Sequence, residues 1–111
     1  MYRVLLPLVL HSCTPSAQLK QLCESQYDRC SFGTYGRLAR MSHGEIQIDR
    51  RTCDRDWPLC AFAIEHEIGH ARGAGSEIAA NCYAYAHSEL PARRASEELF
   101  GSGWYENTCF Q

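Results

Sequence analysis

The residues best suited to chemistry are two histidines and a glutamate in the segment His66-Glu67-Ile68-Gly69-His70. On a helix, positions i and i+4 lie on one face, so His66 and His70 can bind one Zn²⁺. Glu67 lies on the exposed flank, where it can accept a proton from a metal-activated water and return it to a leaving amine. The pattern predicts one zinc site with Glu67 as catalytic base. A helix that merely carries two surface histidines is the alternative.

A catalytic zinc needs a third protein ligand and an open fourth position. The best candidate is Glu77, because a glycine-rich break after His70 lets two helices fold back as an antiparallel pair with His70 opposite Glu77. The same register puts His66 opposite Asn81, whose side chain can orient the imidazole. An ordinary surface acid in a helix's first turn is the other interpretation of Glu77. Two residues further along are alternative ligands: His87 and Glu89.

The helices that must position these residues have clear boundaries in the sequence. A helical segment runs from Leu59 to His70, after Asp56 as a plausible cap and Pro58 in the first turn. The next helix follows Ser76 as its cap and extends over 77–88. Two further helices are expected, at 17–27 and 92–100.

A short sheet is expected before these helices. Residues 37–41 and 45–49 alternate in the manner of strands around Ser42-His-Gly44. This predicts a β-hairpin or two neighbouring short strands, with Ile46 and Ile48 facing the core. Residues 31–36 and 50–57 have the composition of a loop and of a polar turn, respectively. The fold class is therefore α+β, a helical body with a short antiparallel or mixed sheet.

At the histidines and at Glu77-Ile-Ala-Ala80-Asn81-Cys-Tyr-Ala84, the sequence resembles the gluzincin metallopeptidases, in which HExxH is followed by a glutamate ligand in an ExxAD or ExxAN helix. It looks most like small bacterial members, including the single-domain minigluzincins, over about residues 44–86. The resemblance implies a small zincin-like fold with zinc on His66, His70 and Glu77 and Glu67 as general base.

The resemblance also implies an edge strand, here Glu45 to Asp49, that pairs with extended substrate, and a C-terminal segment 101–111 that can line or cover the cleft. Two departures from the family pattern stand out. The link from His70 to Glu77 is much shorter than in thermolysin-like enzymes, and Asn81 stands where aspartate is usual. An amide orients imidazole without adding charge, so the support for the ligand is weaker.

The metzincin pattern HExxHxxGxxH is excluded even though Gly73 matches its glycine. Position 76 is a serine, which is a poor zinc ligand, and both methionines precede the site, so no Met-turn follows it. The sequence does not identify the donor that would stabilise an oxyanion. It offers five candidates, although packing or surface exposure explains each of them better. These candidates are Arg72, Tyr83, Tyr85, His87 and Tyr105.

Seven cysteines without a close CxxC pair indicate disulfides in an oxidising compartment rather than a structural zinc site. Of the 15 connectivities that six cysteines permit, sequential pairing is the expectation. The expected pairs are Cys23 with Cys30, Cys53 with Cys60, and Cys82 with Cys109.

The remaining cysteine, Cys13, lies in a segment with the composition of a leader. Residues 1–17 have a short basic start, an apolar run from Val4 to Leu10 and a small, polar exit, which indicates a signal or lipoprotein leader followed by one domain over 18–111. Cys13 is then removed, or it carries a lipid anchor. In the competing interpretation, residues 3–10 form an edge strand and one thiol stays free.

Length and charge exclude several classes of protein. The 111 residues suffice for one domain, and a formal charge of −2 argues against nucleic-acid binding. The longest apolar run is too short for a transmembrane segment. The prediction is a secreted, monomeric zinc peptidase that acts on peptide or protein substrates. Its rivals are a zinc-binding protein without catalysis that serves interaction or sensing, and a disulfide-stapled interaction module in which HExxH is incidental.

Overall fold

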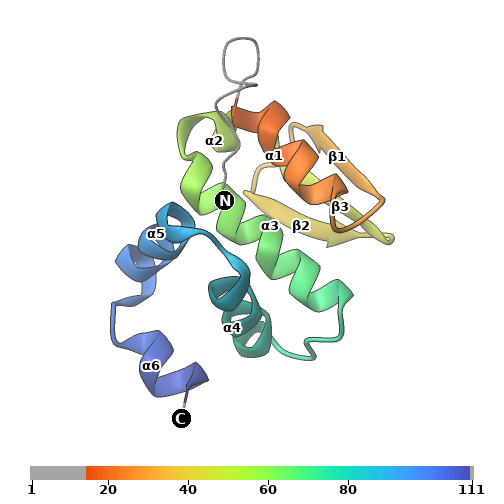
Figure 1. The fold of residues 1–111 in the computed structure, drawn as a ribbon. Helices are drawn as coiled ribbons and strands as arrows, with labels where there is room; N and C mark the ends of the chain where they lie inside the picture. Colours follow the sequence, from red (N-terminus) through yellow and green to blue (C-terminus); the bar gives the residue numbers. More distant parts are fainter. Residues whose placement is uncertain (1–14, 111) are drawn as a thin grey trace.

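The computed structural model describes residues 15–110, which form six helices and three strands, an α+β fold as expected. In chain order the elements are α1 (Pro15–Glu24), β1 (Cys30–Gly33), β2 (Ala39–Ser42), β3 (Glu45–Asp49), α2 (Arg50–Arg55), α3 (Trp57–Ala71), α4 (Glu77–His87), α5 (Leu90–Phe100) and α6 (Trp104–Cys109). Figure 1 shows α3 in the middle of the molecule, with the sheet and α1 on one side and α4, α5 and α6 on the other.

The sheet has the order β1-β3-β2, with β1 parallel and β2 antiparallel to β3. The predicted hairpin is confirmed: His43 and Gly44 both have positive φ, as a two-residue hairpin turn requires. Ile46 and Ile48 are fully buried, also as predicted. The expectation that Glu45–Asp49 is an edge strand is wrong, because β1 covers its second edge. The sequence predicted a loop where β1 lies, because its four residues show no clear alternation of apolar and polar side chains.

Helix α3 starts near the predicted point because its capping signals work as expected. The Asp56 carboxylate accepts the backbone N–H of Leu59, and Pro58 occupies the first turn. The interpretation of 50–57 as a turn is wrong for most of its length. Asp49 accepts the backbone N–H of Thr52 and thereby starts the short helix α2, which ends at Arg55 with Asp56 as its C-cap.

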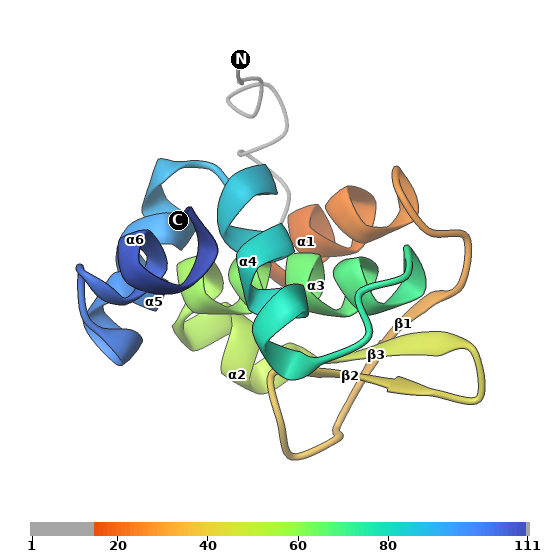
Figure 2. The ribbon, with the colours of Figure 1, turned by 90° about the horizontal axis from the view of Figure 1, so that it is seen from below.

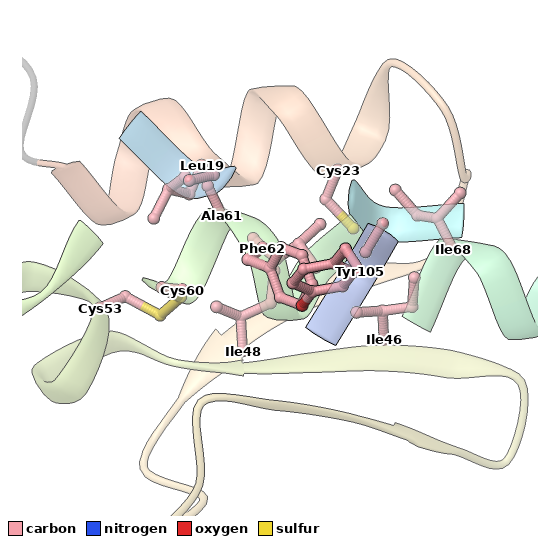
Figure 3. Close-up of a cluster of buried hydrophobic side chains, with 13 residues drawn as sticks. Leu19, Cys23, Ile46, Ile48, Cys53, Cys60, Ala61, Phe62, Ile68 and Tyr105 are labelled. Atoms are coloured by element: carbon pink, nitrogen blue, oxygen red, sulfur yellow. A yellow bond between two sulfur atoms is a disulfide. The ribbon is translucent and has the colours of Figure 1, made fainter. Parts of the chain in front are cut away.

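The core lies between the sheet, α1 and α3 (Figure 3). Side chains from β3 and from all six helices contribute to it. Figure 3 shows the two isoleucines of β3 pointing from the strand toward the helices. Members of this cluster include Leu19, Ile46, Ile48, Phe62, Ile64, Ile68 and Tyr105. Because α3 is packed on the sheet, on α1 and on α4 and α5, its backbone is held on several sides. The helix is therefore a rigid base for the residues of the HExxH segment.

Three disulfides join the cysteines in the predicted sequential order: Cys23–Cys30, Cys53–Cys60 and Cys82–Cys109. They tie α1 to β1, α2 to α3, and α4 to α6. The break at Asp56 allows the second pair, because two cysteines seven positions apart on one continuous helix would be too far apart to bond. Three disulfides are typical of proteins from oxidising compartments.

Most of the predicted leader, including Cys13, lies outside the described residues. Helix α1 begins at Pro15 and so includes the last three residues of that leader. Among residues 15–110, no helix combines the length and the apolar character needed to cross a bilayer.

Candidate metal centre

Helices α3 and α4 form the antiparallel pair that the sequence predicts, and the link between them brings the expected residues together. Figure 2 shows α4 folded back beside α3, with the link turning at one end of the pair. His70 faces Glu77, and His66 faces Asn81. Gly73, at φ 108°, supplies the left-handed conformation that lets the chain reverse directly after α3.

Three potential ligand groups converge at this hairpin. His66 Nε2 lies 2.8 Å from Glu77 Oε1, and His70 Nε2 lies 3.3 Å from Glu77 Oε2. One ligand atom from each residue can be chosen so that all lie within 4.8 Å of one another. Two imidazole nitrogens and one carboxylate form the ligand set of many catalytic zinc sites, so the residues present fit Zn²⁺.

The opposite ring nitrogens are occupied by hydrogen bonds, which fixes the orientation of both imidazoles. Asn81 Oδ1 lies 2.6 Å from His66 Nδ1, and the carbonyl oxygen of Ala74 lies 3.1 Å from His70 Nδ1. A carbonyl oxygen only accepts, so each Nδ1–H donates, and Nε2 is the nitrogen of each ring that can bind a metal once its proton has left. The role of Asn81 matches the sequence prediction. The backbone carbonyl of Ala74 was missed, because no side chain signals it.

The site is open to solvent on the Glu77 side. The side chain of Glu77 is 79% exposed, whereas those of His66 and His70 are 15% and 25% exposed. Hydrogen bonds from His70 and His66 hold the pKa of Glu77 below its usual range. Burial lowers the pKa of His70, but the hydrogen bonds to Ala74 and Glu77 outweigh it and leave the pKa raised. The Glu77 carboxylate is therefore ionised at neutral pH, as a metal ligand must be.

Glu67 is half-buried beside this group. Burial raises the pKa of its carboxyl, and the nearby charges of His66, His70 and Arg37 act in the opposite direction. Glu67 and His66 both line an open cleft of about 320 Å³. The carboxylate thus faces a space that a ligand can enter, next to the convergent ligand atoms.

The candidate oxyanion donors do not line this cleft. Arg72 donates to the carbonyl oxygen of Gln26, and Tyr85 donates to the carboxylate of Glu97. Tyr105 is buried against Tyr85. The other two stack on each other: Tyr83 and His87.

The cation that lines the cleft is Arg37, which precedes β2 and which sequence reasoning did not single out. No local motif could have identified it, because only the sheet brings it to α3. Within the described residues, the group able to hold a metal contains neither His87 nor Glu89. Residues 101–110 contribute nothing to the cleft, since the Cys82–Cys109 disulfide and buried Tyr105 hold this segment elsewhere.

Comparison of the chain with protein-family models, with curated proteins and with solved structures finds no match. The chemistry of the site therefore rests on its own geometry.

Proposed function

We propose that the chain is a zinc-dependent peptidase of the gluzincin type, secreted into an oxidising compartment. The observation that carries the proposal is the convergence of His66 Nε2, His70 Nε2 and the Glu77 carboxylate, with both Nδ1 atoms held by other acceptors. A pair of incidental surface histidines has no reason to share one carboxylate and to have both Nδ1 atoms oriented by other groups.

In this proposal His66, His70 and Glu77 hold the metal, which when bound polarises a peptide carbonyl and lowers the pKa of water. Glu67 takes a proton from the attacking water and delivers it to the amine that leaves. Burial raises the pKa of the Glu67 carboxyl and so makes it a stronger base. Asn81 and the carbonyl oxygen of Ala74 keep the two imidazoles in their binding orientation.

The strand available for an extended peptide is β2 rather than β3. The carbonyl oxygen of Leu38 accepts the N–H of Asp49, so in this antiparallel register the N–H and C=O of Ala39 and Met41 point away from β3. Leu38 and Ala39 also line the cleft beside Glu67. A peptide that pairs with β2 would therefore run toward the catalytic glutamate.

Zinc content and peptide hydrolysis together test the proposal. Zinc per molecule is measured by inductively coupled plasma mass spectrometry on the oxidised full chain and on Glu77→Ala, Glu67→Gln and the exposed control Glu24→Gln. We expect one zinc in the parent, in Glu67→Gln and in the control, and strong loss in Glu77→Ala. Cleavage of a mixed peptide library should be present in the parent and control and absent in Glu67→Gln.

Each other outcome has a definite meaning. Zinc without cleavage in the parent would identify a zinc-binding protein without peptidase activity. Absence of zinc from the parent would overturn the proposal altogether and favour an interaction module held by its disulfides. Equal zinc in the parent and Glu77→Ala would remove Glu77 from the ligand set.

A further inference from the structure

The cleft beside Glu67 has apolar walls on two helices. Leu59 and Phe62 of α3 form one side, and Leu99 and Phe100 at the end of α5 form the other. Leu99 is 62% exposed and Phe100 is 40% exposed, although both border the cleft. An apolar side chain displaces water favourably from such surfaces. The space is at the small end of ligand pockets and suits one large side chain.

A single cation, Arg37, lies at the edge of this cleft among the described residues that line it. Arg37 is exposed, and within residues 15–110 it makes no hydrogen bond or ion pair that would occupy its guanidinium. A planar guanidinium binds a carboxylate through two parallel hydrogen bonds. The cleft thus combines an apolar space with a guanidinium, that of Arg37, that can bind one carboxylate. Glu67, the proposed catalytic base, lines the same cleft.

We propose that this cleft binds the C-terminal residue of a peptide, with its apolar side chain between α3 and α5 and its free carboxylate on Arg37. The proposal rests on the proposed function and narrows it to a carboxypeptidase for apolar C-terminal residues. The bond that breaks is the last peptide C–N bond. Water gives its hydroxyl to the acyl carbon and its proton to the departing nitrogen, so the products are a shortened peptide and one free amino acid.

A binding experiment tests the subsite without relying on turnover. Isothermal titration calorimetry compares N-acetyl-L-phenylalanine with N-acetyl-L-phenylalaninamide on the zinc-loaded protein. We expect the acid to bind at least about tenfold more tightly than the amide, and Arg37→Gln to abolish this preference. The exposed control Arg94→Gln should keep it. Leu99→Ser should weaken both ligands equally, because the apolar contact is common to them.

A persistent preference for the acid in Arg37→Gln would overturn the proposal, because the carboxylate would then bind elsewhere, for instance on the metal. Equal binding of acid and amide by the parent would overturn it as well.

A hydrolysis experiment separates this proposal from the proposed function. The substrates are acetyl-Ala-Ala-Ala-Phe with a free carboxylate and the same peptide with a C-terminal amide, with products identified by mass spectrometry. We expect free phenylalanine from the acid and a rate at least tenfold lower for the amide. Internal cleavage of both peptides at similar rates would support a peptidase but overturn the C-terminal subsite. Absence of cleavage with an intact, Arg37-dependent binding preference would overturn the peptidase and support the subsite.

Discussion

Tyr83 of α4 packs directly on Gly69 of α3. A Cβ atom at Gly69 would lie 3.0 Å from Tyr83 Cδ1 and 3.1 Å from Tyr83 Cβ. Because the missing side chain lets the helices approach this closely, the contact fixes how α4 sits on α3. That placement puts His66 and His70 next to Glu77 on the opposite helix.

We expect Gly69→Ala to destabilise the protein and to weaken metal binding. Rotation of the Tyr83 ring cannot relieve the clash, because Tyr83 Cβ is itself within 3.1 Å, so α4 must move away. Overpacking of this kind costs about 1–3 kcal/mol, and the better helix propensity of alanine offsets up to about 1 kcal/mol of it. Urea unfolding should show a net loss of about 1 kcal/mol, and zinc affinity should fall because Glu77 moves with α4.

The matched control is Gly75→Ala, since an added methyl group at Gly75 meets nothing within 4 Å. Its stability should change by less than about 0.5 kcal/mol. If Gly69→Ala unfolds at the same urea concentration as this control and binds zinc as tightly as the parent, the contact does not set the helix spacing.

Asn81 should govern metal affinity through the hydrogen bond from His66 Nδ1. Loss of such an orienting partner reduces metal affinity by about 10–100-fold, which is the range we expect for Asn81→Ala. Asn81→Asp should bind zinc at least as tightly as the parent, because a carboxylate keeps the acceptor and adds negative charge. A competition titration with a chromophoric chelator measures both, with the exposed Asn107→Ala as control. Unchanged affinity in Asn81→Ala would mean that the bond does not support the ligand.

Local signals in the sequence were sufficient to predict which residues converge at the α3–α4 hairpin. The HExxH spacing fixes which face of α3 carries the histidines, and the caps Asp56 and Ser76 mark where α3 and α4 begin. The short link leaves little freedom in register, so His66 and Asn81 could be paired from their positions alone. The three disulfides could also be predicted, because each joins cysteines that are consecutive in the sequence.

The parts that the sequence did not predict depend on contacts between distant segments. β1 is a strand because it lies parallel to β3, and its own four residues show no strand pattern. Its presence turns the expected edge strand into the central one. Arg37 reaches the cleft only through the sheet, and the partner of His70 is a backbone carbonyl, which no residue type reveals.

Asp49 should make stability depend on acid pH. Its buried carboxylate accepts hydrogen bonds from the hydroxyl and N–H of Thr52 and from the N–H groups of Tyr35 and Gly36. The Thr52 hydroxyl is the largest cause that holds the pKa of Asp49 well below its usual range. A lowered folded-state pKa adds stability above the unfolded pKa, about 3.9, and this stability is lost as the pH falls below that value.

We therefore expect Asp49→Asn to unfold about 2 kcal/mol more easily than the parent at pH 7. The difference in unfolding free energy should be smaller at pH 3, because protonation of Asp49 removes part of the stability that its carboxylate gives the parent. Urea unfolding at both pH values measures this, and comparison within each pH cancels any common loss of metal. The exposed control Asp28→Asn should stay within about 0.5 kcal/mol of the parent at both. A constant difference between pH 7 and pH 3 would show that the charge of Asp49 does not stabilise the fold.

The Cys82–Cys109 disulfide should be the first to open under mild reduction. Both of its cysteines are partly exposed, whereas each of the other two bonds contains at least one fully buried cysteine: Cys23 in one, Cys53 and Cys60 in the other. Attack by a thiolate requires access to sulfur. Graded dithiothreitol followed by iodoacetamide and mass spectrometry should label Cys82 and Cys109 before the buried pair. The Cys82→Ser/Cys109→Ser protein should lose about 3 kcal/mol of stability, since the bond closes a loop between α4 and α6. Simultaneous labelling of all cysteines would instead mean that reduction proceeds through global unfolding, and that α6 does not separate from α4 on its own.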